Sequence, residues 1–383
     1  MDIIIACQEA TVQISCEDAK ELTGKAVEAQ SSYCLVKEAS PEDAATLTYQ
    51  CQGAHRIGVF LASGSTKDEL EQALQDTPEL KNLQGESFAV RCVKIDPEGR
   101  HPQHAETTVD IATYFGGHIH HILPEKKVDL KQPDTLLTII MFPTELVCCI
   151  DLVGVDMASR PYKVFAHPAS VNGVVAYSAA RLAGATKEST VLDPFCDCAT
   201  IPIEIALWQE NSSGFLFSRD FVALRYPQFA NAFDQKIKDL KKNKVEGTPN
   251  IYAFEPQLRV MLQAKKNIKL SGVQDAIACS KVTTDWIDAK FEEQQVDCIV
   301  SKPPQISKRT PSAKQIHKIY DELFYQARYI LKKEGAVALL MHHPEHLDAH
   351  IQKHNFAIQK TFPLWGGKQV LTLVVAKQVN KND

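Results

Sequence analysis

Residues 193–207, with the sequence DPFCDCATIPIEIAL, constrain the fold of this chain more than any other segment. They follow residues 190–192, which are typical of a buried strand, and they predict a tight loop and then a helix. Pro202 falls in the first helical turn, where its missing N–H removes no hydrogen bond. An acidic residue where a strand meets such a loop is typical of the pocket of a doubly wound α/β domain. We therefore expect a mostly parallel sheet with helices on both faces.

The length of 383 residues is too great for one ordinary hydrophobic core, so two or three domains are expected. Residues 1–62 alternate strand and helix patterns like a small ferredoxin-like α+β domain, residues 63–155 form a second α+β domain, and residues 156–383 form the α/β domain. The expected strands are 1–7, 32–36, 57–61, 88–93, 136–142, 145–152, 190–192, 250–254, 276–280, 296–301, 336–341 and 370–376. The expected helices are 17–22, 41–49, 103–115, 174–182, 257–270 and 316–331, with one more ending at residue 74.

The composition excludes some classes of protein. A net charge of −5 gives no support for a globally basic nucleic-acid binder, although a local basic patch stays compatible with it. No apolar run reaches the roughly 18 residues that a transmembrane helix needs. The first residues, MDIIIAC, lack the basic start and the long apolar stretch of a signal peptide. A cytoplasmic location without membrane contact is the expectation.

The 11 cysteines are odd in number and include no C-x-x-C pair. Zinc sites usually use wider pairs than Cys148–Cys149 or Cys196–Cys198. We expect reduced and mostly buried thiols and no metal. His342, His343 and His346 have no cysteine or acidic partner at metal spacing, so they are interpreted as surface or RNA-facing residues.

Two motifs resemble those of methyltransferases that act on amino groups. Residues 193–204 resemble the S-adenosylmethionine loop written D-P-F-C-G-S-G-T-I-P-I-E, with Asp197, Cys198 and Ala199 in place of Gly, Ser and Gly. Residues 296–305, VDCIVSKPPQ, resemble the strand and loop written D-x-I-V-x-N-P-P-Y. There Lys302 replaces Asn or Asp, and Gln305 replaces the aromatic residue.

The rest of the chain extends the resemblance. Residues 88–94, 128–134 and the two strands after them look like a THUMP domain, a module that holds RNA. Arg160-Pro-Tyr162 and His167-Pro resemble the R-x-Y and H-P segment before the cofactor loop. The chain thus resembles the THUMP-containing tRNA (guanine-N2) methyltransferases. The resemblance implies a ferredoxin-like domain, a THUMP domain and a Rossmann-like domain in that order. It also implies methyl transfer from S-adenosylmethionine to an exocyclic amine of RNA, with tRNA guanine N2 as the expected target. DNA is not expected as a partner, and a monomer is the default.

The resemblance also implies a set of cofactor-binding residues. Glu255 would accept the ribose hydroxyls, or else be a surface glutamate at a helix start. Asp285 would contact adenine with Trp286 stacking on it, or else Trp286 would be a buried anchor. Asp197 would repel or attract the cofactor depending on where its carboxylate points. The full set is Asp193, Phe195, Cys196, Asp197, Thr200, Glu255, Asp285 and Trp286.

The target base would be handled by Lys302, Pro303, Pro304 and Gln305. A charged lysine has no hydrogen-bond acceptor, so it cannot do the work of Asn or Asp at this position. Burial could lower the pKa of Lys302 and free a lone pair. Gln305 could bond a base edge but could not stack like an aromatic residue.

Basic residues near these motifs could contact the RNA backbone. The candidates are Lys308, Arg309, Lys314 and Lys318, which would otherwise be ordinary exposed residues. A second lysine run would be a phosphate contact or a solvated helix end; its residues are Lys236, Lys238, Lys241, Lys242 and Lys244.

The changed motifs leave a rival hypothesis, a non-catalytic RNA-binding relative that kept the fold. The two altered loops favour it. Retention of Asp193, Glu255, Asp285 and both prolines favours an enzyme.

Overall fold

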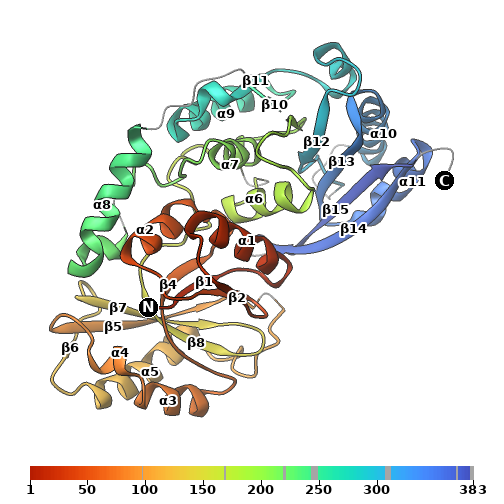
Figure 1. The fold of residues 1–383 in the computed structure, drawn as a ribbon. Helices are drawn as coiled ribbons and strands as arrows, with labels where there is room; N and C mark the ends of the chain where they lie inside the picture. Colours follow the sequence, from red (N-terminus) through yellow and green to blue (C-terminus); the bar gives the residue numbers. More distant parts are fainter. Residues whose placement is uncertain are drawn as a thin grey trace. The chain divides into compact units, whose positions relative to one another are not determined.

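The computed structural model describes residues 1–96, 98–167, 170–218, 221–242, 249–306, 312–367 and 370–379. The chain divides into two compact units, each with its own sheet (Figure 1). The first consists of Met1–Met157 with Ser218–Lys242, and the second of Ala158–Phe217 with Asn243–Asp383. No helix in the described ranges is long and apolar enough to cross a membrane.

An eight-stranded sheet with the order β2-β3-β1-β4-β8-β7-β5-β6 forms the centre of the first unit. Its strands are β1 (Ile3–Ala6), β2 (Val27–Ala29), β3 (Tyr33–Val36), β4 (Arg56–Gly64), β5 (Ser87–Lys94), β6 (Lys127–Val128), β7 (Thr135–Met141) and β8 (Leu146–Asp151). Its helices are η1 (Glu9–Thr11), α1 (Val12–Thr23), α2 (Pro41–Gln50), α3 (Lys67–Gln75), α4 (Pro78–Lys81), α5 (Thr108–Ile122), η2 (Val222–Arg225) and α8 (Pro227–Lys242).

The first four strands confirm the ferredoxin-like expectation. They alternate with α1 and α2 as β-α-β-β-α-β, and β1 pairs antiparallel with both β3 and β4. Ser40 caps helix α2: Ser40 Oγ accepts from Asp43 N while the Asp43 carboxylate accepts from Ser40 N, which fixes the start of the helix. Strand β2 was not expected from the sequence. Helix α5 begins later than expected, because Thr107 caps it.

The expected boundary at residue 62 falls inside a strand. Strand β4 pairs with β1 on one side and with β8 on the other, so residues 1–62 and the residues after them share one sheet. Helices α3 and α5 cover the second half through a core around Phe88, Phe115 and Leu137. The three-domain division stays a prediction, and the compact units divide the chain differently.

Residues 218–242, expected within the third domain, belong to the first unit. Tyr226 OH donates to Asp151 O, and it accepts from Leu136 N, each at 3.0 Å. Phe233 of α8 packs against Tyr49 of α2, with ring centroids 5.8 Å apart. These contacts explain why the segment leaves the α/β unit to which its place in the sequence assigned it.

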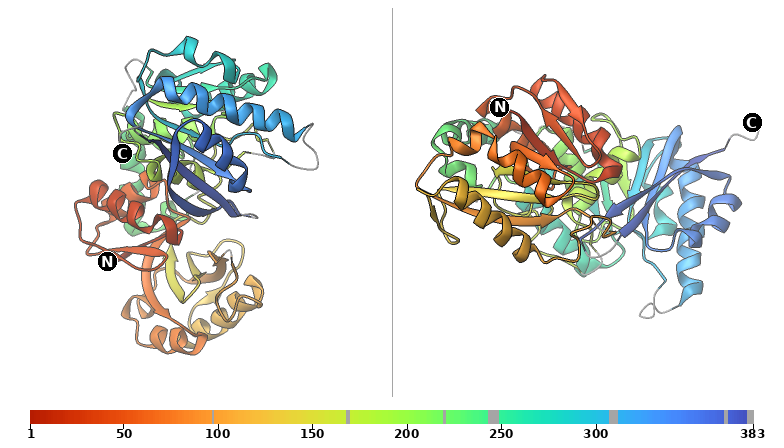
Figure 2. Two further views of the ribbon diagram at one scale, coloured as in Figure 1. Left: turned by 90° about the vertical axis from the view of Figure 1, so that its right-hand side faces the viewer. Right: turned by 90° about the horizontal axis from the view of Figure 1, so that it is seen from below.

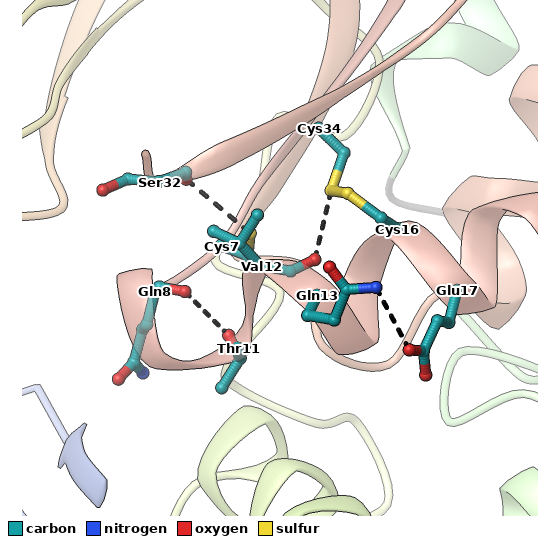
Figure 3. Close-up of a disulfide and its surroundings, with 9 residues drawn as sticks. All are labelled: Cys7, Gln8, Thr11, Val12, Gln13, Cys16, Glu17, Ser32 and Cys34. Carbon is teal, nitrogen blue, oxygen red and sulfur yellow. Dashed lines mark hydrogen bonds between the residues drawn. A yellow bond between two sulfur atoms is a disulfide. The ribbon is translucent and has the colours of Figure 1, made fainter. Parts of the chain in front are cut away.

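A disulfide joins Cys16 of α1 to Cys34 of β3 (Figure 3). The expectation of reduced thiols throughout is therefore wrong for this pair. The two Cα atoms lie 5.8 Å apart, within the range that a disulfide spans. The other nine cysteines are free; among them, the Cys7 thiol donates to Ser32 O at 3.7 Å, close to the disulfide.

The second unit is a seven-stranded sheet with the order β11-β10-β9-β12-β13-β15-β14. Its strands are β9 (Val191–Asp193), β10 (Ile251–Phe254), β11 (Ile277–Ser280), β12 (Val296–Ser301), β13 (Leu331–Met341), β14 (Phe356–Trp365) and β15 (Val370–Gln378). Its helices are α6 (Gly173–Leu182), α7 (Thr200–Gln209), α9 (Leu258–Ser271), η3 (Gln274–Ala276), η4 (Thr284–Trp286), η5 (Asp288–Lys290), α10 (Ala313–Ile330), η6 (Pro344–Leu347) and α11 (Asp348–Lys353).

This sheet confirms the Rossmann-like expectation. Strands β9 to β13 are parallel, and only β15 runs antiparallel to its neighbours β13 and β14. Helices α6, α7 and α9 lie on one face, and α10 and α11 lie on the other (Figure 2). Strands β10 and β12 flank β9, so the strand order reverses at β9. In open α/β sheets ligands bind outside the carboxyl ends of the strands at such a reversal.

Candidate cofactor and substrate site

The carboxyl ends of β9 and β12 are joined by a hydrogen bond between side chains. Asp193 ends β9 and is 2% exposed, and Ser301 ends β12. Ser301 Oγ donates to Asp193 Oδ1 at 2.6 Å, and Phe195 N donates to the same oxygen at 3.2 Å. Burial raises the pKa of Asp193 to about 7, although the Ser301 bond acts to lower it. The two motifs found in the sequence therefore meet at Asp193.

The loop after β9 has a turn of the kind that glycine favours, although it lacks the glycines of the motif that it resembles. Asp197 has φ 47° and Ala199 has φ 63°, both in the left-handed region. The loop is held by Ala199 N, which donates to Cys196 O at 2.7 Å, and by Cys196 N, which donates to Phe254 O of β10 at 2.9 Å. Asp197 and Ala199, which stand where the motif has glycine, thus adopt the left-handed conformation that glycine favours.

Replacing Ala199 by glycine is expected to stabilise the protein by about 1 kcal/mol. An L-residue in the left-handed conformation loses about 1–2 kcal/mol, and the extra freedom of glycine in the unfolded chain offsets part of that gain. Urea unfolding followed by tryptophan fluorescence measures it. Ala206→Gly, inside α7, is the matched control and is expected to destabilise by about 1 kcal/mol. If the free energy of unfolding of A199G is no higher than that of the wild type, Ala199 is not strained.

Glu255 is buried, which rules out the alternative of a surface glutamate. It is 6% exposed, and its Oε2 accepts from Asp197 N at 3.3 Å while its Oε1 accepts from Gln257 N at 3.0 Å. Burial raises the pKa of Glu255. A carboxylate has about four acceptor positions, so Glu255 can hold the loop and still accept two ligand hydroxyls.

Asp197 lies close to His167 and to two lysines. Its Oδ1 is 3.8 Å from His167 Nδ1 and accepts from the Cys198 thiol at 3.6 Å. Burial lowers the pKa values of Lys302 and Lys163, and the carboxylate of Asp197 opposes the lowering in both cases. The carboxylate of Asp197 therefore acts electrostatically on both lysines.

Two buried oxygen atoms of this loop fit a polar ligand. Asp197 Oδ2 and Thr200 Oγ1 have no hydrogen-bond partner among the described residues. Buried polar atoms of this kind are rare unless a ligand or water satisfies them. Together with the carboxylates of Asp193 and Glu255 they make an acidic site, which suits a ligand that carries positive charge and hydroxyl groups.

Two other residues of this loop, Phe195 and Cys196, are buried in the interior of the unit. Phe195 is 8% exposed and packs with Leu192 and Phe254 in the hydrophobic core of the unit, so only its backbone faces the turn. The thiol of Cys196 donates to Asp197 O at 3.9 Å. Both residues position the loop.

The loop after β12 is fixed by its neighbours. Tyr320 OH donates to Pro304 O at 2.7 Å. Gln305 Nε2 donates to Leu340 O at 3.0 Å, and Gln305 Oε1 accepts from His342 N at 2.7 Å. Gln305 therefore holds the loop to the end of β13, a different role from the base contact expected for it. Lys302 is half-buried, and Pro303 follows it at the carboxyl edge.

Asp285 and Trp286 lie on η4, which follows the carboxyl end of β11. Trp286 is 63% exposed, so it is not a buried anchor. With Asp285 and Tyr329 it lines a cavity of about 410 Å³. Tyr329 O accepts from Gln294 N, two residues before β12 begins, which places the cavity toward the amino end of that strand. The contact of Asp285 and Trp286 with adenine stays a prediction.

The expected RNA-binding residues are only partly visible. Lys308 and Arg309 lie outside the described residues, as does Lys244. Lys314 and Lys318 are exposed on α10, and Lys236, Lys238, Lys241 and Lys242 are on α8 of the first unit. In the described ranges no group of His, Cys, Asp and Glu could hold a metal ion, and His343 Nδ1 lies 3.2 Å from Glu345 Oε1.

Residues 160–370 match the family model described as UPF0020: RMKL-like, methyltransferase domain. The match spans more than half of the chain. The chain belongs to this family. The expectation of a methyltransferase domain is thereby confirmed.

Two curated relatives carry the same name, tRNA (guanine(6)-N2)-methyltransferase. The one from Methanocaldococcus jannaschii is 28% identical over 295 residues, which is 74% of each chain. The one from Archaeoglobus fulgidus is 28% identical over 228 residues, 58% of this chain and 52% of that protein. The crystal structure of TrmN from Thermus thermophilus has a TM-score of 0.67 and 20% identity and covers 99% of both chains, which shows a shared fold.

The family match begins at Arg160, a residue for which the sequence motifs indicate no site role. Arg160 Nε and Nη2 donate to the two carboxylate oxygens of Glu204 at 2.8 and 2.9 Å, and Tyr162 OH donates to Glu204 Oε1 at 2.6 Å. A Cβ on Gly173 would lie 2.4 Å from Arg160 Nε. The R-x-Y segment and the last glutamate of the loop motif are thus partners, and Gly173 makes room for them. Both the R-x-Y segment and Glu204 belong to recognisable motifs, but nothing in the sequence indicates that the two motifs contact each other.

Proposed function

We propose that this protein is a methyltransferase that transfers a methyl group from S-adenosylmethionine to the exocyclic N2 of guanine in tRNA. The observation that carries the proposal is the Ser301–Asp193 hydrogen bond, which joins the cofactor loop to the loop that would receive the base. Membership of a methyltransferase family and the names of the two archaeal relatives support it.

The acidic loop is suited to the cofactor. S-adenosylmethionine supplies an electrophilic methyl group on a cationic sulfur, and it carries an ammonium group. Asp193 and Asp197 would stabilise positive charge, and Glu255 would accept the ribose hydroxyls while it holds Asp197 N. Thr200 Oγ1, at the start of α7, offers one more hydrogen-bonding group.

Lys302 would take the place of the Asn or Asp of related loops. Burial lowers the pKa of Lys302, which favours the neutral amine, and the lone pair of a neutral Nζ would accept an N–H of the target amine. The lone pair of the amine forms the new N–C bond, and the electrons of the broken S–C bond stay on sulfur. The surplus proton on nitrogen then passes to Lys302 Nζ and on to water. Pro303 and Gln305 keep the loop in place.

The other expectations complete the proposal. Residues 63–155 would hold the tRNA as a THUMP domain, next to the ferredoxin-like residues 1–62. The protein would act as a monomer in the cytoplasm, without a DNA partner.

Calorimetric titration with S-adenosylmethionine tests the proposal. Micromolar affinity is expected; no heat at millimolar ligand would instead favour the non-catalytic relative. Labelled methyl transfer to bulk tRNA, followed by nucleoside analysis, is expected to give N2-methylguanosine. Binding of the cofactor without any labelled guanosine would assign the site to a different target.

Affinity for S-adenosylmethionine is expected to increase up to about tenfold between about pH 6 and pH 8. Asp193 has its pKa raised to about 7, so its carboxylate forms over this range and can then attract the cation. The Ser301 hydrogen bond lowers that pKa, so Ser301→Ala should move the midpoint to higher pH. Asp193→Asn should abolish the dependence.

Ser178→Ala is the matched control, because Ser178 is also buried, at 1% exposure, but lies on α6 away from Asp193. Calorimetry at several pH values measures the effect. A pH dependence that survives in Asp193→Asn would show that another group titrates.

A further inference from the structure

A second cavity in the α/β unit lies beside the cofactor loop. It has a volume of about 670 Å³, within the range of small-ligand sites. Its walls are the segment before α6, the segment after α7 and the carboxyl-terminal half of α9. The residues used below are Tyr162, Phe165, Phe217, Lys266, Lys269 and Leu270.

The walls of this cavity are apolar and aromatic, yet they face solvent. Phe217 is 67% exposed and Leu270 is 44% exposed. Lys266 Nζ lies 4.9 Å from the centroid of the Phe165 ring, so a cation sits over an aromatic face at the rim. Exposed apolar surface around a cavity marks an interaction site. Aromatic faces next to lysines are the combination that binds unpaired nucleotides.

Helix α9 is strongly basic although the chain as a whole is acidic. It carries Arg259, Lys265, Lys266 and Lys269 and contains no acidic residue, in a protein of net charge −5. Arg259, Lys266 and Lys269 are spaced by seven and three residues, which puts them on one face of the helix. All four side chains are exposed. The charge of this face complements a phosphate backbone.

The cavity is tied to the cofactor loop by one buried residue. Asn267 of α9 is 0% exposed, and its Nδ2 donates to Cys198 O at 3.0 Å and to Phe165 O at 2.8 Å. Its Oδ1 accepts from Phe165 N at 3.0 Å. The wall that carries the aromatic ring is therefore fixed to the same loop as Asp197.

We propose that this cavity and the basic face of α9 bind an unpaired nucleotide of the substrate RNA, with its base against Phe165 and Phe217 and its flanking phosphates on Lys266 and Lys269. The proposal rests on the proposed function, since it assumes that RNA is the substrate. It names a contact surface that is separate from the base loop at Lys302 and from the lysines of α8 and α10.

Binding of bulk tRNA, measured by fluorescence anisotropy over a salt series, tests it. The double variant Lys266→Ala, Lys269→Ala is expected to bind about tenfold more weakly, and the slope of log K against log salt should fall by about 1.4 for two contacts to single-stranded RNA. Phe217→Ala is expected to weaken binding about tenfold with an unchanged salt slope, because it removes stacking and no charge. Phe217→Leu keeps an apolar side chain but has no aromatic ring. Weaker binding in this variant would therefore indicate loss of stacking and not loss of packing.

The matched control is Lys290→Ala, Lys333→Ala, two exposed lysines elsewhere in the same unit, which should bind like the wild type. Affinity for S-adenosylmethionine should be unchanged in every variant. If the wild type methylates tRNA, but the α9 and Phe217 variants bind tRNA with unchanged affinity and salt slope, this proposal is wrong and the proposed function still stands. If the wild type neither binds nor methylates tRNA, both this proposal and the proposed function are wrong.

Discussion

Replacing Glu204 by alanine is expected to lower the free energy of unfolding of the α/β unit by about 3–5 kcal/mol. The side chains of Arg160 and Glu204 are 1% and 0% exposed, so the substitution leaves the guanidinium buried without its counter-ion. It also removes the acceptor of Tyr162 OH. All three tryptophans of the chain, Trp208, Trp286 and Trp365, are in this unit, so tryptophan fluorescence in urea follows its unfolding.

Two further variants separate the ion pair from its surroundings. Tyr162→Phe removes one hydrogen bond to a charged group and should cost about 1.5–3 kcal/mol. Glu204→Leu combined with Arg160→Met removes both charges and should recover much of the loss, because no charge is left unpaired. A Glu204→Ala variant within about 1 kcal/mol of the wild type would show that the pair contributes little to folding.

The parts of the fold that could be predicted depend on local sequence. The strand, loop and helix around Asp193 form from neighbouring residues, and the helix after the loop begins where the pattern placed it. The left-handed positions at Asp197 and Ala199 also agree with the motif, because glycine at both places indicates a turn with positive φ.

The parts that could not be predicted depend on contacts distant in sequence. The partners of the Cys16–Cys34 disulfide come together only when α1 packs on β3. Gln305 reaches the end of β13, 35 residues later in the chain, and no motif signals that contact. The exposure of Trp286 likewise depends on how η4 packs against α10, where Trp286 and Tyr329 line one cavity, and no local pattern signals that packing.

Substituting Lys302 by alanine is expected to lower kcat by about a hundredfold or more, the usual contribution of a positioned proton acceptor. Affinities for cofactor and tRNA should change much less, because the loop is held by Tyr320 and Gln305. Single-turnover transfer of labelled methyl to tRNA measures the rate. Lys302→Arg keeps a positive charge that cannot be removed, so it should be as inactive as the alanine variant.

The pH profile distinguishes a proton acceptor from a mere positive charge. Burial lowers the pKa of Lys302 below its usual 10.5, and the neutral amine is the form that accepts an N–H. With S-adenosylmethionine saturating, wild-type activity should therefore rise with pH as the amine loses its proton. Lys302→Asn, which restores the residue of related loops, should regain activity relative to alanine and lose this rise, because an amide accepts at any pH. Full activity in Lys302→Arg, or the same rise in Lys302→Asn, would show that the lysine is not the acceptor.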